Sequence, residues 1–438
     1  MQRAVSILAL LLIVACGDDE QIASDAGGGG SGHEHDGHVH MPFEPVPDAS
    51  YERDSGQQDS GGRDDDGGAE SDAALPDPFD WPLPAWLPTP VVPDDNPMSA
   101  AKVELGRHLF YDTRLSENQT QSCASCHVQA LAFTDGLALA VGSTGEEHPR
   151  NSMALANVAY AASLTWANPA LLQLEHQAIV PIFGDRPVEL GLRGKEELLV
   201  ERLRAEPRYT ALFPRAYPEQ ADPFTVGNVT RALSAFQRVM ISSDSPYDRY
   251  VYGGDDDAIS DAAKRGGDLF NSEKLECFHC HNGFNFQDSI NYVGKGSLEL
   301  RFHNTGLYNI GGTGAYPSPN TGVHELTQKP EDMGRFRVPS LRNIALTAPY
   351  MHDGSITTLD QVIDHYAAAG RSIASGPNAG DGSASPFKSD LIIGFSISAE
   401  ERADLIAFLE SLTDETFISD PKLSDPWSAP CTLCSVGD

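Results

Sequence analysis

A CxxCH pentapeptide occurs twice in this chain, at residues 123–127 and 277–281. Two cysteines at this spacing can form thioether bonds to the two vinyl groups of one haem, and the histidine that follows can bind its iron. A four-cysteine zinc site is the alternative, but it would leave both histidines without a role. The sequence therefore predicts two covalently attached c-type haems, held by Cys123, Cys126 and His127 and by Cys277, Cys280 and His281.

The two motifs lie in an internal repeat. Residues 105–127 (LGRHLFYDTRLSENQTQSCASCH) resemble residues 265–281 (RGGDLFNSEKLECFHCH), with Gly106 matching Gly266. In each copy an amphipathic helix is expected to lead into a loop and then the motif. Apolar residues also recur at helical spacing in other segments, while no convincing run of alternating residues predicts strands. These segments are residues 195–206, 226–240 and 398–412. We therefore expect a mainly α fold with two cytochrome c-like haem domains, long irregular connections and a preceding disordered N-terminal tether.

The first residues have the pattern of an export signal. Arg3 precedes an apolar run at residues 4–15, which is too short for a confident transmembrane helix. Residues 13–16 then resemble a lipobox, so Cys16 is the expected site of lipid attachment. The alternative is a plain secretory signal followed by an incidental cysteine. Both interpretations predict export from a bacterial cytoplasm, and the first predicts a lipid-anchored periplasmic protein of a Gram-negative bacterium.

Composition changes sharply after this signal. The formal net charge is -33, and much of the acidity lies in residues 17–74. An acidic chain is a poor match for nucleic acid, because phosphate binding needs clusters of Lys and Arg. Residues 17–74 also contain too few large apolar groups to offset the entropy of ordering. The tract holds four clustered histidines, which either bind copper, zinc or nickel or form a solvated tract that takes up metals adventitiously. They are His33, His35, His38 and His40.

The expected domain order follows from these patterns. A lipoprotein signal peptide occupies residues 1–16, and a disordered acidic, His-rich and Pro-rich linker occupies residues 17–92. An N-terminal c-type haem domain is expected at residues 93–255 and a C-terminal c-type haem domain at residues 256–415. A tail at residues 416–438 contains a third CxxC, formed by Cys431 and Cys434. Because Ser435 follows in place of histidine, a disulfide is favoured there over a third haem.

Residues 174–192 (LEHQAIVPIFGDRPVELGL) favour a reaction over electron transfer alone. They place Gln177 and Glu189 in a region that is otherwise apolar and rich in turns. A haem that reacts with peroxide needs an open face and a polar group that moves a proton between the two peroxide oxygens. Glu189 has the required chemistry, although spacing alone is more typical of a surface glutamate.

Residues 93 to about 412 resemble the bacterial di-haem cytochrome c peroxidase and MauG superfamily. The matching stretches are KVELGRHLFYDTRLS, SCASCH, PRNSMALANVAY, CFHCH and VPSLRNIALTAPYMHDGSITTLDQVIDHY. Three further stretches are most similar to MbnH-type enzymes: PDDNPMSAAKVELGRHLFYD, LTWANPALLQLEHQAIVPIFGDRPVELGL and FHNTGLYNIGGTGAY. The resemblance implies an enzyme that uses hydrogen peroxide, through a high-valent di-haem state, to convert a tryptophan of a partner to kynurenine. That partner would be an exported, copper-binding MbnP-like protein.

The resemblance also implies roles for single residues. The haem on residues 123–127 would react with peroxide, with Glu189 as the distal acid-base group and Gln177 beside it. Trp166 would lie between the haems as an electron relay, although simple aromatic packing is the alternative. A Ca²⁺ ion between the domains would be bound by Asn151 and by the backbone carbonyls of Thr347 and Pro349.

One departure from the family pattern concerns the iron that reacts with peroxide. Conventional di-haem peroxidases carry a histidine shortly before the PRNS stretch, and it blocks this iron until the other haem is reduced. Ser143 stands at the matching position, and serine is a poor haem ligand. His148 lies nearby but adjoins the PRN turn. The resemblance therefore implies an open, five-coordinate site that needs no reductive activation.

Four side chains at residues 346–370 could bind the second haem from the side opposite His281: Met351, His352, His365 and Tyr366. Leu359, Val362, Ile363 and Tyr366 share one helical stripe, which predicts that Tyr366 faces inward and His365 faces solvent. The family's sixth ligand lies on this helix, as methionine in conventional peroxidases and tyrosine in MauG, and Tyr366 matches it. His352 matches a histidine beside the C-terminal haem that has a structural or relay role.

Three functions remain in contention at this point. The favoured one is oxidation of a partner protein by peroxide. The first alternative is a peroxidase that takes electrons from a small cytochrome c or cupredoxin, which Ser143 and Tyr366 disfavour. The second is an electron carrier without enzymatic activity, which would require both irons to be six-coordinate.

Overall fold

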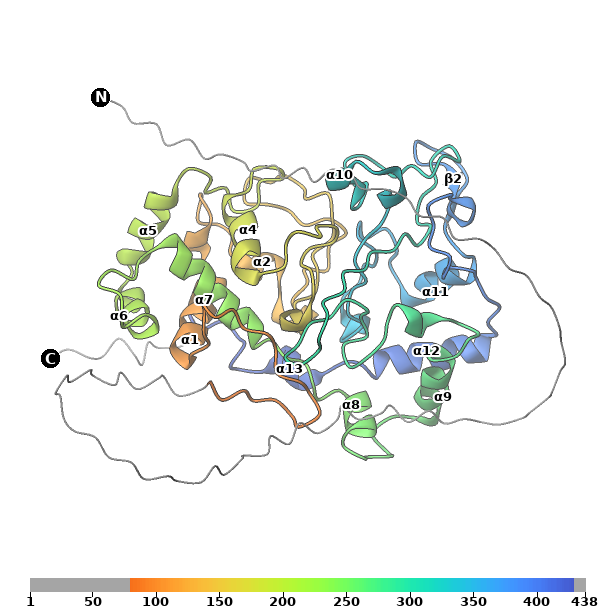
Figure 1. The fold of residues 1–438 in the computed structure, drawn as a ribbon, viewed down its shortest axis with the longest axis horizontal. Coiled ribbons are helices and arrows are strands. Elements are labelled where there is room, and N and C mark those ends of the chain that lie inside the picture. Colours follow the sequence, from red (N-terminus) through yellow and green to blue (C-terminus); the bar gives the residue numbers. More distant parts are fainter. Residues whose placement is uncertain (1–78, 429–438) are drawn as a thin grey trace, which may run out of the picture. The chain divides into compact units, whose positions relative to one another are not determined.

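A computed structural model of the protein describes residues 79–428. Within this range the chain is mostly helical with long irregular connections (Figure 1). Three groups of predicted sites lie outside the described residues: the lipid attachment site, the tether histidines and the third CxxC. They are Cys16, His33, His35, His38, His40, Cys431 and Cys434.

We refer to residues 93–255 as the N-terminal lobe and to residues 256–415 as the C-terminal lobe. The helices before residue 255 are α1 (Ala100–Phe110), α2 (Cys123–Cys126), α3 (Leu174–Gln177), α4 (Ile179–Phe183), α5 (Glu196–Arg204), α6 (Pro207–Ala216), α7 (Val226–Arg238) and α8 (Pro246–Val251). Those after it are α9 (Asp261–Phe270), α10 (His324–Thr327), α11 (Leu359–Ala367), α12 (Ala399–Glu410) and α13 (Glu415–Ser419).

Strands are nearly absent from the described residues. Two antiparallel strands, β1 (Ser372–Ile373) and β2 (Gly380–Asp381), form the one sheet found between residues 79 and 428. None of the helices in that range is long and apolar enough to cross a membrane. The prediction of a mainly α fold is confirmed for this part of the chain.

The helices expected from apolar spacing all form. Residues 195–206 contain α5, residues 226–240 contain α7 and residues 398–412 contain α12. Local sequence fixes where they begin. The Thr225 side chain caps α7 by accepting from the Asn228 N–H, and Ser398 with Glu401 forms a capping box at α12.

The internal repeat corresponds to two similar helix pairs. Helix α1 packs against α7 in the N-terminal lobe, and α9 packs against α12 in the C-terminal lobe (Figure 1). A Cβ atom at Gly106 would lie 1.9 Å from the Ala232 carbonyl oxygen, and one at Gly266 would lie 1.9 Å from the Asp404 carbonyl oxygen. Glycine is required at both crossings because the helix backbones approach too closely for any side chain.

The aromatic cores around these crossings repeat as well. The rings of Phe110 and Phe236 lie 5.4 Å apart, and those of Phe270 and Phe408 lie 5.1 Å apart, between centroids. In both lobes this aromatic core reaches the histidine of the CxxCH motif. The two helix pairs therefore bring equivalent surfaces to the two motifs.

Segments at both ends of the described range contact the N-terminal lobe. The Tyr160 hydroxyl donates to the Pro88 carbonyl oxygen at 2.6 Å, so the Pro-rich stretch lies against the folded body. Phe417 and Leu423 are buried in the core of the N-terminal lobe. The Trp427 indole N–H donates to the His108 carbonyl oxygen at 3.0 Å. The chain therefore returns to the N-terminal lobe after completing the C-terminal one.

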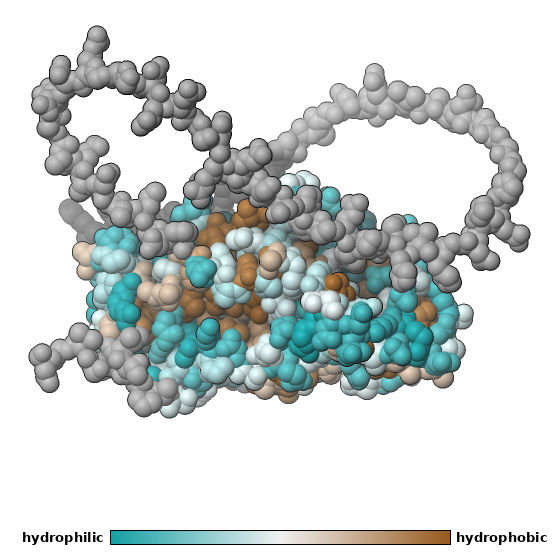
Figure 2. Space-filling view, turned by 90° about the horizontal axis from the view of Figure 1, so that it is seen from below, coloured by the Kyte–Doolittle hydropathy of each residue, from teal (hydrophilic) through white to brown (hydrophobic). Residues whose placement is uncertain are grey.

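The surface is not uniformly polar. On the face seen from below, hydrophobic residues gather near the middle and hydrophilic residues surround them (Figure 2). Hydrophobic and hydrophilic residues are therefore unevenly distributed over this face.

Replacing either crossing glycine with alanine should destabilise the fold. We expect Gly106→Ala and Gly266→Ala each to lower the free energy of unfolding by about 1–3 kcal/mol, because the helices must separate to admit a methyl group. Gly227→Ala in α7 is the control, since its Cβ would meet only the Thr225 hydroxyl oxygen, at 3.9 Å. Thermal unfolding followed by circular dichroism measures the effect. Equal melting temperatures for all three variants would contradict the proposed role of the crossings.

Candidate functional site

The two CxxCH histidines are held in the same way. His127 Nδ1 lies 2.8 Å from the Phe133 carbonyl oxygen, and His281 Nδ1 lies 3.0 Å from the Phe286 carbonyl oxygen. Both phenylalanines have left-handed backbone angles, with φ of 61° and 48°. Donation from Nδ1 to a carbonyl leaves the Nε2 lone pair available, which is how iron-binding histidines are usually oriented. Burial lowers the pKa of both imidazoles, which favours the neutral form that binds metals.

The four motif cysteines are free thiols, although each pair has the spacing of a redox disulfide. Burial raises the pKa of Cys123, Cys277 and Cys280 to about 12 and that of Cys126 to about 11. Such thiols are protonated at neutral pH and unreactive toward oxidants. Because no disulfide joins them, all four sulfur atoms are available for thioether bonds.

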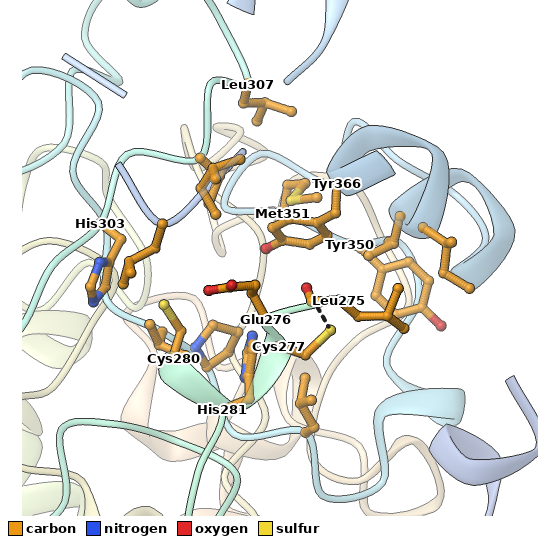
Figure 3. A pocket seen from close by; sticks show the side chains of 18 of the residues that line it. Leu275, Glu276, Cys277, Cys280, His281, His303, Leu307, Tyr350, Met351 and Tyr366 are labelled. Carbon is orange, nitrogen blue, oxygen red and sulfur yellow. Dashed lines mark hydrogen bonds between the residues drawn. The ribbon is translucent and has the colours of Figure 1, made fainter. Parts of the chain in front are cut away.

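A cavity of about 200 Å³ adjoins the second motif. Cys277, Cys280 and His281 form one side, while Tyr366 and Met351 lie on the other (Figure 3). Most of the remaining wall is aliphatic or aromatic. The cavity therefore has what a haem requires: two attachment points, an axial imidazole, an apolar wall and a second axial position.

The position of Tyr366 agrees with its predicted inward orientation, whereas the prediction for His365 was wrong. Tyr366 lines the cavity, but His365 is 4% exposed and does not face solvent. Helix α11 is covered on a second face, where His365 packs near Thr305 and Arg371. Helical phase identifies which residues share a face, but it cannot show that a neighbouring loop covers the other face.

Axial ligation by Tyr366 would require loss of its phenolic proton. Burial raises the pKa of this phenol well above its ordinary value, so the unbound group is neutral. A bound cation reverses this preference by stabilising the anion. Met351 needs no such change, and because both side chains line the cavity, geometry alone does not choose between them.

Arg337 provides an independent test of whether haem fits. Its guanidinium is buried, and burial lowers its pKa to about 10. It donates to the Thr165 carbonyl oxygen at 3.1 Å and to the Met153 sulfur at 3.2 Å, and no carboxylate in residues 79–428 forms an ion pair with it. The charge of Asp288 raises this pKa only in part, because Asp288 lies beyond ion-pair distance, and a buried cation without a close anion is unfavourable. Haem carries two propionates, which are the kind of anion that Arg337 lacks.

Trp166 belongs to the N-terminal lobe but joins both lobes. Its indole N–H donates to the Asn151 carbonyl oxygen at 2.8 Å, and its own carbonyl oxygen accepts from the Arg337 N–H at 2.8 Å. The ring lines the C-terminal cavity and also a smaller cavity of about 70 Å³. Its position between the lobes is therefore as the sequence predicted.

The predicted calcium residues come together at the smaller cavity. Asn151, Thr347 and Pro349 all line it, and no carboxylate does among the described residues. The Asn151 amide N–H donates to the Leu137 carbonyl oxygen at 2.6 Å, which leaves its side-chain oxygen free to act as a ligand. Calcium usually takes six to eight oxygen ligands, so these residues could supply part of such a shell.

His352 lies in the wall of the C-terminal cavity. Its imidazole stacks on Phe336 with ring centroids 3.7 Å apart, and its Nε2 has no hydrogen-bond partner among the described residues. Burial lowers its pKa to about 4, so the ring is neutral. The residue thus lies beside the cavity, in the place predicted for it.

Glu189 lies near the first motif. Its charge acts on Cys123 and Cys126, and burial raises its own pKa to about 7. The segment around it pairs with α4, because the Leu190 N–H donates to the Pro181 carbonyl oxygen at 2.9 Å. A carboxyl group that titrates near neutrality suits acid-base work.

A tight loop at residues 142–147 positions Glu189 from its other side. The Ser143 N–H donates to the Glu189 carbonyl oxygen at 2.7 Å. A Cβ atom at Gly142 would lie 2.0 Å from the Val188 carbonyl oxygen, so the two backbones are in close contact. His148, which follows the loop, places Nε2 3.9 Å from a Glu189 carboxylate oxygen. The loop thus carries serine, not an iron-binding side chain, at the position noted in the sequence.

Gln177 is at the end of α3, which leads directly into α4. Its side chain is half-buried and forms no hydrogen bond to Glu189 within residues 79–428. The two predicted distal groups therefore belong to adjoining segments, without a direct bond between them.

Fold and site together define a helix-rich oxidoreductase built around two c-type haem sites. A sequence profile described as di-haem cytochrome c peroxidase matches residues 100–257. The chain is 36% identical over 353 residues to cytochrome-c peroxidase IdrP1 of Denitromonas iodatirespirans, covering 77% of this chain and 88% of that protein. It is 35% identical over 325 residues to methylamine utilization protein MauG of Methylorubrum extorquens, covering 74% and 81%. The chain belongs to the di-haem cytochrome c peroxidase family and is a haem-dependent oxidoreductase.

Solved structures agree with this assignment. A MauG-like protein associated with microbial copper homeostasis is 51% identical, with a TM-score of 0.78 over 80% of this chain and 99% of that one. The di-haem peroxidase BthA of Burkholderia thailandensis shares the fold at 19% identity, with a TM-score of 0.54 over 75% of this chain and 91% of its own.

Three features of the site were not identified from sequence. Arg337 directly precedes the stretch of family resemblance that begins at Val338, and nothing in its spacing indicates a buried cation without an ion pair. The contact between His148 and Glu189 joins distant segments. Asp288 and His303 form a buried pair beside Cys280, with a carboxylate oxygen 2.7 Å from Nε2. Each depends on long-range packing, and sequence periodicity contains no signal for it.

Replacing each of the two candidate axial ligands in turn will identify the one that binds the second haem. Tyr366→Phe should open the sixth position of the second haem and change its visible and electron paramagnetic resonance spectra. Met351→Leu should leave that coordination intact, because leucine has a volume and apolar character similar to those of methionine and so preserves the packing. An unchanged spectrum for Tyr366→Phe together with an altered one for Met351→Leu would assign the methionine instead.

Proposed function

We propose that this protein uses hydrogen peroxide to oxidise a tryptophan of an exported partner, converting it to kynurenine. The partner would be an MbnP-like copper-binding protein. The observation that carries the proposal is the 51% identity to a MauG-like protein associated with copper homeostasis, over 99% of that chain. Membership of a family that includes MauG makes peroxide chemistry on a protein substrate a coherent expectation.

The N-terminal motif would hold the haem that reacts with peroxide. Haem iron, when bound to His127, supplies the electron transfer needed to reduce peroxide. Glu189 takes a proton from one peroxide oxygen and returns it to the departing oxygen, so that water leaves. Its pKa of about 7 allows it both to accept and to release that proton near neutral pH. Ser143 leaves the face beside Glu189 open to peroxide.

Electrons would reach this site from the C-terminal lobe. Trp166 lies between the lobes, and its indole N–H is held by the Asn151 carbonyl oxygen at 2.8 Å. An oxidisable ring there divides a long electron path into shorter steps. His281 and Tyr366 would hold the second haem, which would draw electrons from the partner across the protein surface. Long-range transfer would thereby remove the need for the partner to enter a cavity.

Calcium and location complete the proposal. Asn151, Thr347 and Pro349 line the smaller cavity together with Trp166. A Ca²⁺ ion bound by these three residues would therefore hold the two lobes together beside Trp166. The export signal places the enzyme in the periplasm, anchored by a lipid on Cys16. The histidines at residues 33–40 provide a second, sequence-based link to copper.

The direct test is the mass of the partner after reaction. Holoenzyme, peroxide and an MbnP-like protein are mixed, and the partner is analysed by intact and peptide mass spectrometry. We expect a mass change that matches kynurenine at one tryptophan, and a much slower change with Trp166→Phe. Trp86→Phe is the matched control, because Trp86 stacks on Tyr252 at 3.9 Å and lines neither cavity.

The same experiment tests the alternative function. Identity of 36% to a cytochrome-c peroxidase favours an enzyme that reduces peroxide with electrons from a small cytochrome c or cupredoxin. An unmodified partner together with rapid oxidation of such a donor would establish that function and refute the first proposal.

The pH dependence of the reaction with peroxide tests the role of Glu189. Because the carboxylate accepts the proton, the rate should rise with pH through about 7. Glu189→Gln should lower it by roughly 10²–10⁴-fold and remove the rise. Glu146→Gln, a neighbouring exposed carboxylate, is the control. His148→Gln should keep the rise of the rate through about pH 7. If this variant alone loses that rise, the titrating group is His148 and not Glu189.

A further inference from the structure

Beside the C-terminal cavity lies a short chain of aromatic rings that none of the roles above involves. Tyr316 lines the cavity, and its ring centroid is 6.2 Å from that of His352. Tyr308 is the next ring outward, 5.4 Å from Tyr316. Tyr308 does not line the cavity and is 7% exposed. The two tyrosines therefore connect the cavity wall to a second, buried phenol outside the cavity.

The Tyr308 hydroxyl has a base beside it. It donates to the Asp353 carboxylate at 2.7 Å, and Asp353 is half-buried. The guanidinium of Arg371 lies 5.8 Å from the ring centroid. Burial raises the pKa of the phenol to about 12. The proton therefore rests on Tyr308 and can move to Asp353 only when the phenol becomes far more acidic.

Loss of an electron produces that change, because an oxidised phenol is a strong acid. Tyr316 lacks such a base: its hydroxyl donates to the Asn304 amide oxygen at 2.8 Å and accepts from the Leu307 N–H. An amide does not take up a proton at neutral pH. Of this pair, Tyr308 is thus the residue at which oxidation and proton loss can occur together.

A second tyrosine shows that the phenol–carboxylate bond alone does not define such a site. Tyr209 donates to the Asp112 carboxylate at the same distance, 2.7 Å, and is 0% exposed. Its ring contacts Phe213 and Trp427 in the N-terminal core and has no contact with the C-terminal cavity. What distinguishes Tyr308 is the aromatic contact that leads from that cavity.

We propose that Tyr308 is a redox-active residue that holds one oxidising equivalent outside the C-terminal cavity. When peroxide oxidises the protein, one electron passes from Tyr308 through Tyr316 to the C-terminal haem site. The phenolic proton passes to Asp353, which becomes a neutral carboxylic acid. Tyr308 is left as a neutral radical, and peroxide is the oxidant that balances the step. The inference rests on peroxide oxidation by the family's haems and not on the identity of the partner.

Electron paramagnetic resonance on freeze-quenched samples tests this inference. Holoenzyme that contains ring-deuterated tyrosine is mixed with peroxide, without any partner, and compared with unlabelled enzyme. We expect an organic radical signal that narrows on deuteration, and its loss in Tyr308→Phe. Tyr209→Phe should retain the signal, because that phenol is not connected to the cavity. The visible spectrum of each oxidised variant checks that both haem sites are intact.

Asp353→Asn supplies a second, independent variant. It keeps the Tyr308 phenol but removes the base, so the tyrosine signal should form more slowly than in the wild type. A tyrosine signal of equal size in Tyr308→Phe would overturn the proposal. So would wild-type enzyme that consumes peroxide without any tyrosine signal, and this second result would leave the proposed function standing.

Discussion

Each lobe of this protein depends on one hydrogen bond, from the Nδ1 atom of a buried CxxCH histidine to a backbone carbonyl. The carbonyl belongs to a phenylalanine in the left-handed region, five or six residues further along the chain. This bond turns Nε2 toward the place where iron would bind, and the aromatic core packs against the same ring. The helix pairs supply that core, and the crossing glycines set how closely they pack. The two copies of the repeat therefore position the histidine of a covalent haem site in the same way.

The two sites differ in what faces the histidine, and these differences define the chemistry. On the N-terminal side, Glu189 is fixed through its backbone by the loop that carries Ser143. On the C-terminal side, Tyr366 and Met351 lie opposite His281 in a mainly apolar cavity (Figure 3). Between them, Trp166 bonds to both lobes through its indole and its backbone. One site thus has a carboxyl group that titrates near neutrality, the other is lined by a phenol and a thioether, and the proposed relay residue bonds to both lobes.

Local features of the sequence predicted much of this arrangement. Both motifs, the helix that precedes each one and the inward orientation of Tyr366 depend on spacing within a few turns, and the structure agrees. His365 was placed wrongly because a loop near Thr305 covers the second face of α11, and helical phase carries no information about it. Arg337, the contact of His148 with Glu189 and the bond of Tyr308 to Asp353 all join distant parts of the chain. Only tertiary structure brings such pairs together, so periodicity could not identify them.

We propose that the N-terminal site is open in the oxidised protein, since Ser143 replaces the histidine expected in a conventional peroxidase. The most direct test mixes fully oxidised holoenzyme with peroxide in a stopped-flow spectrometer, without any reductant. An immediate change in the haem spectrum and consumption of peroxide are predicted. A protein that stays unchanged until one haem has been reduced would contradict this prediction, because a ligand would then block its iron as the histidine does in a conventional peroxidase.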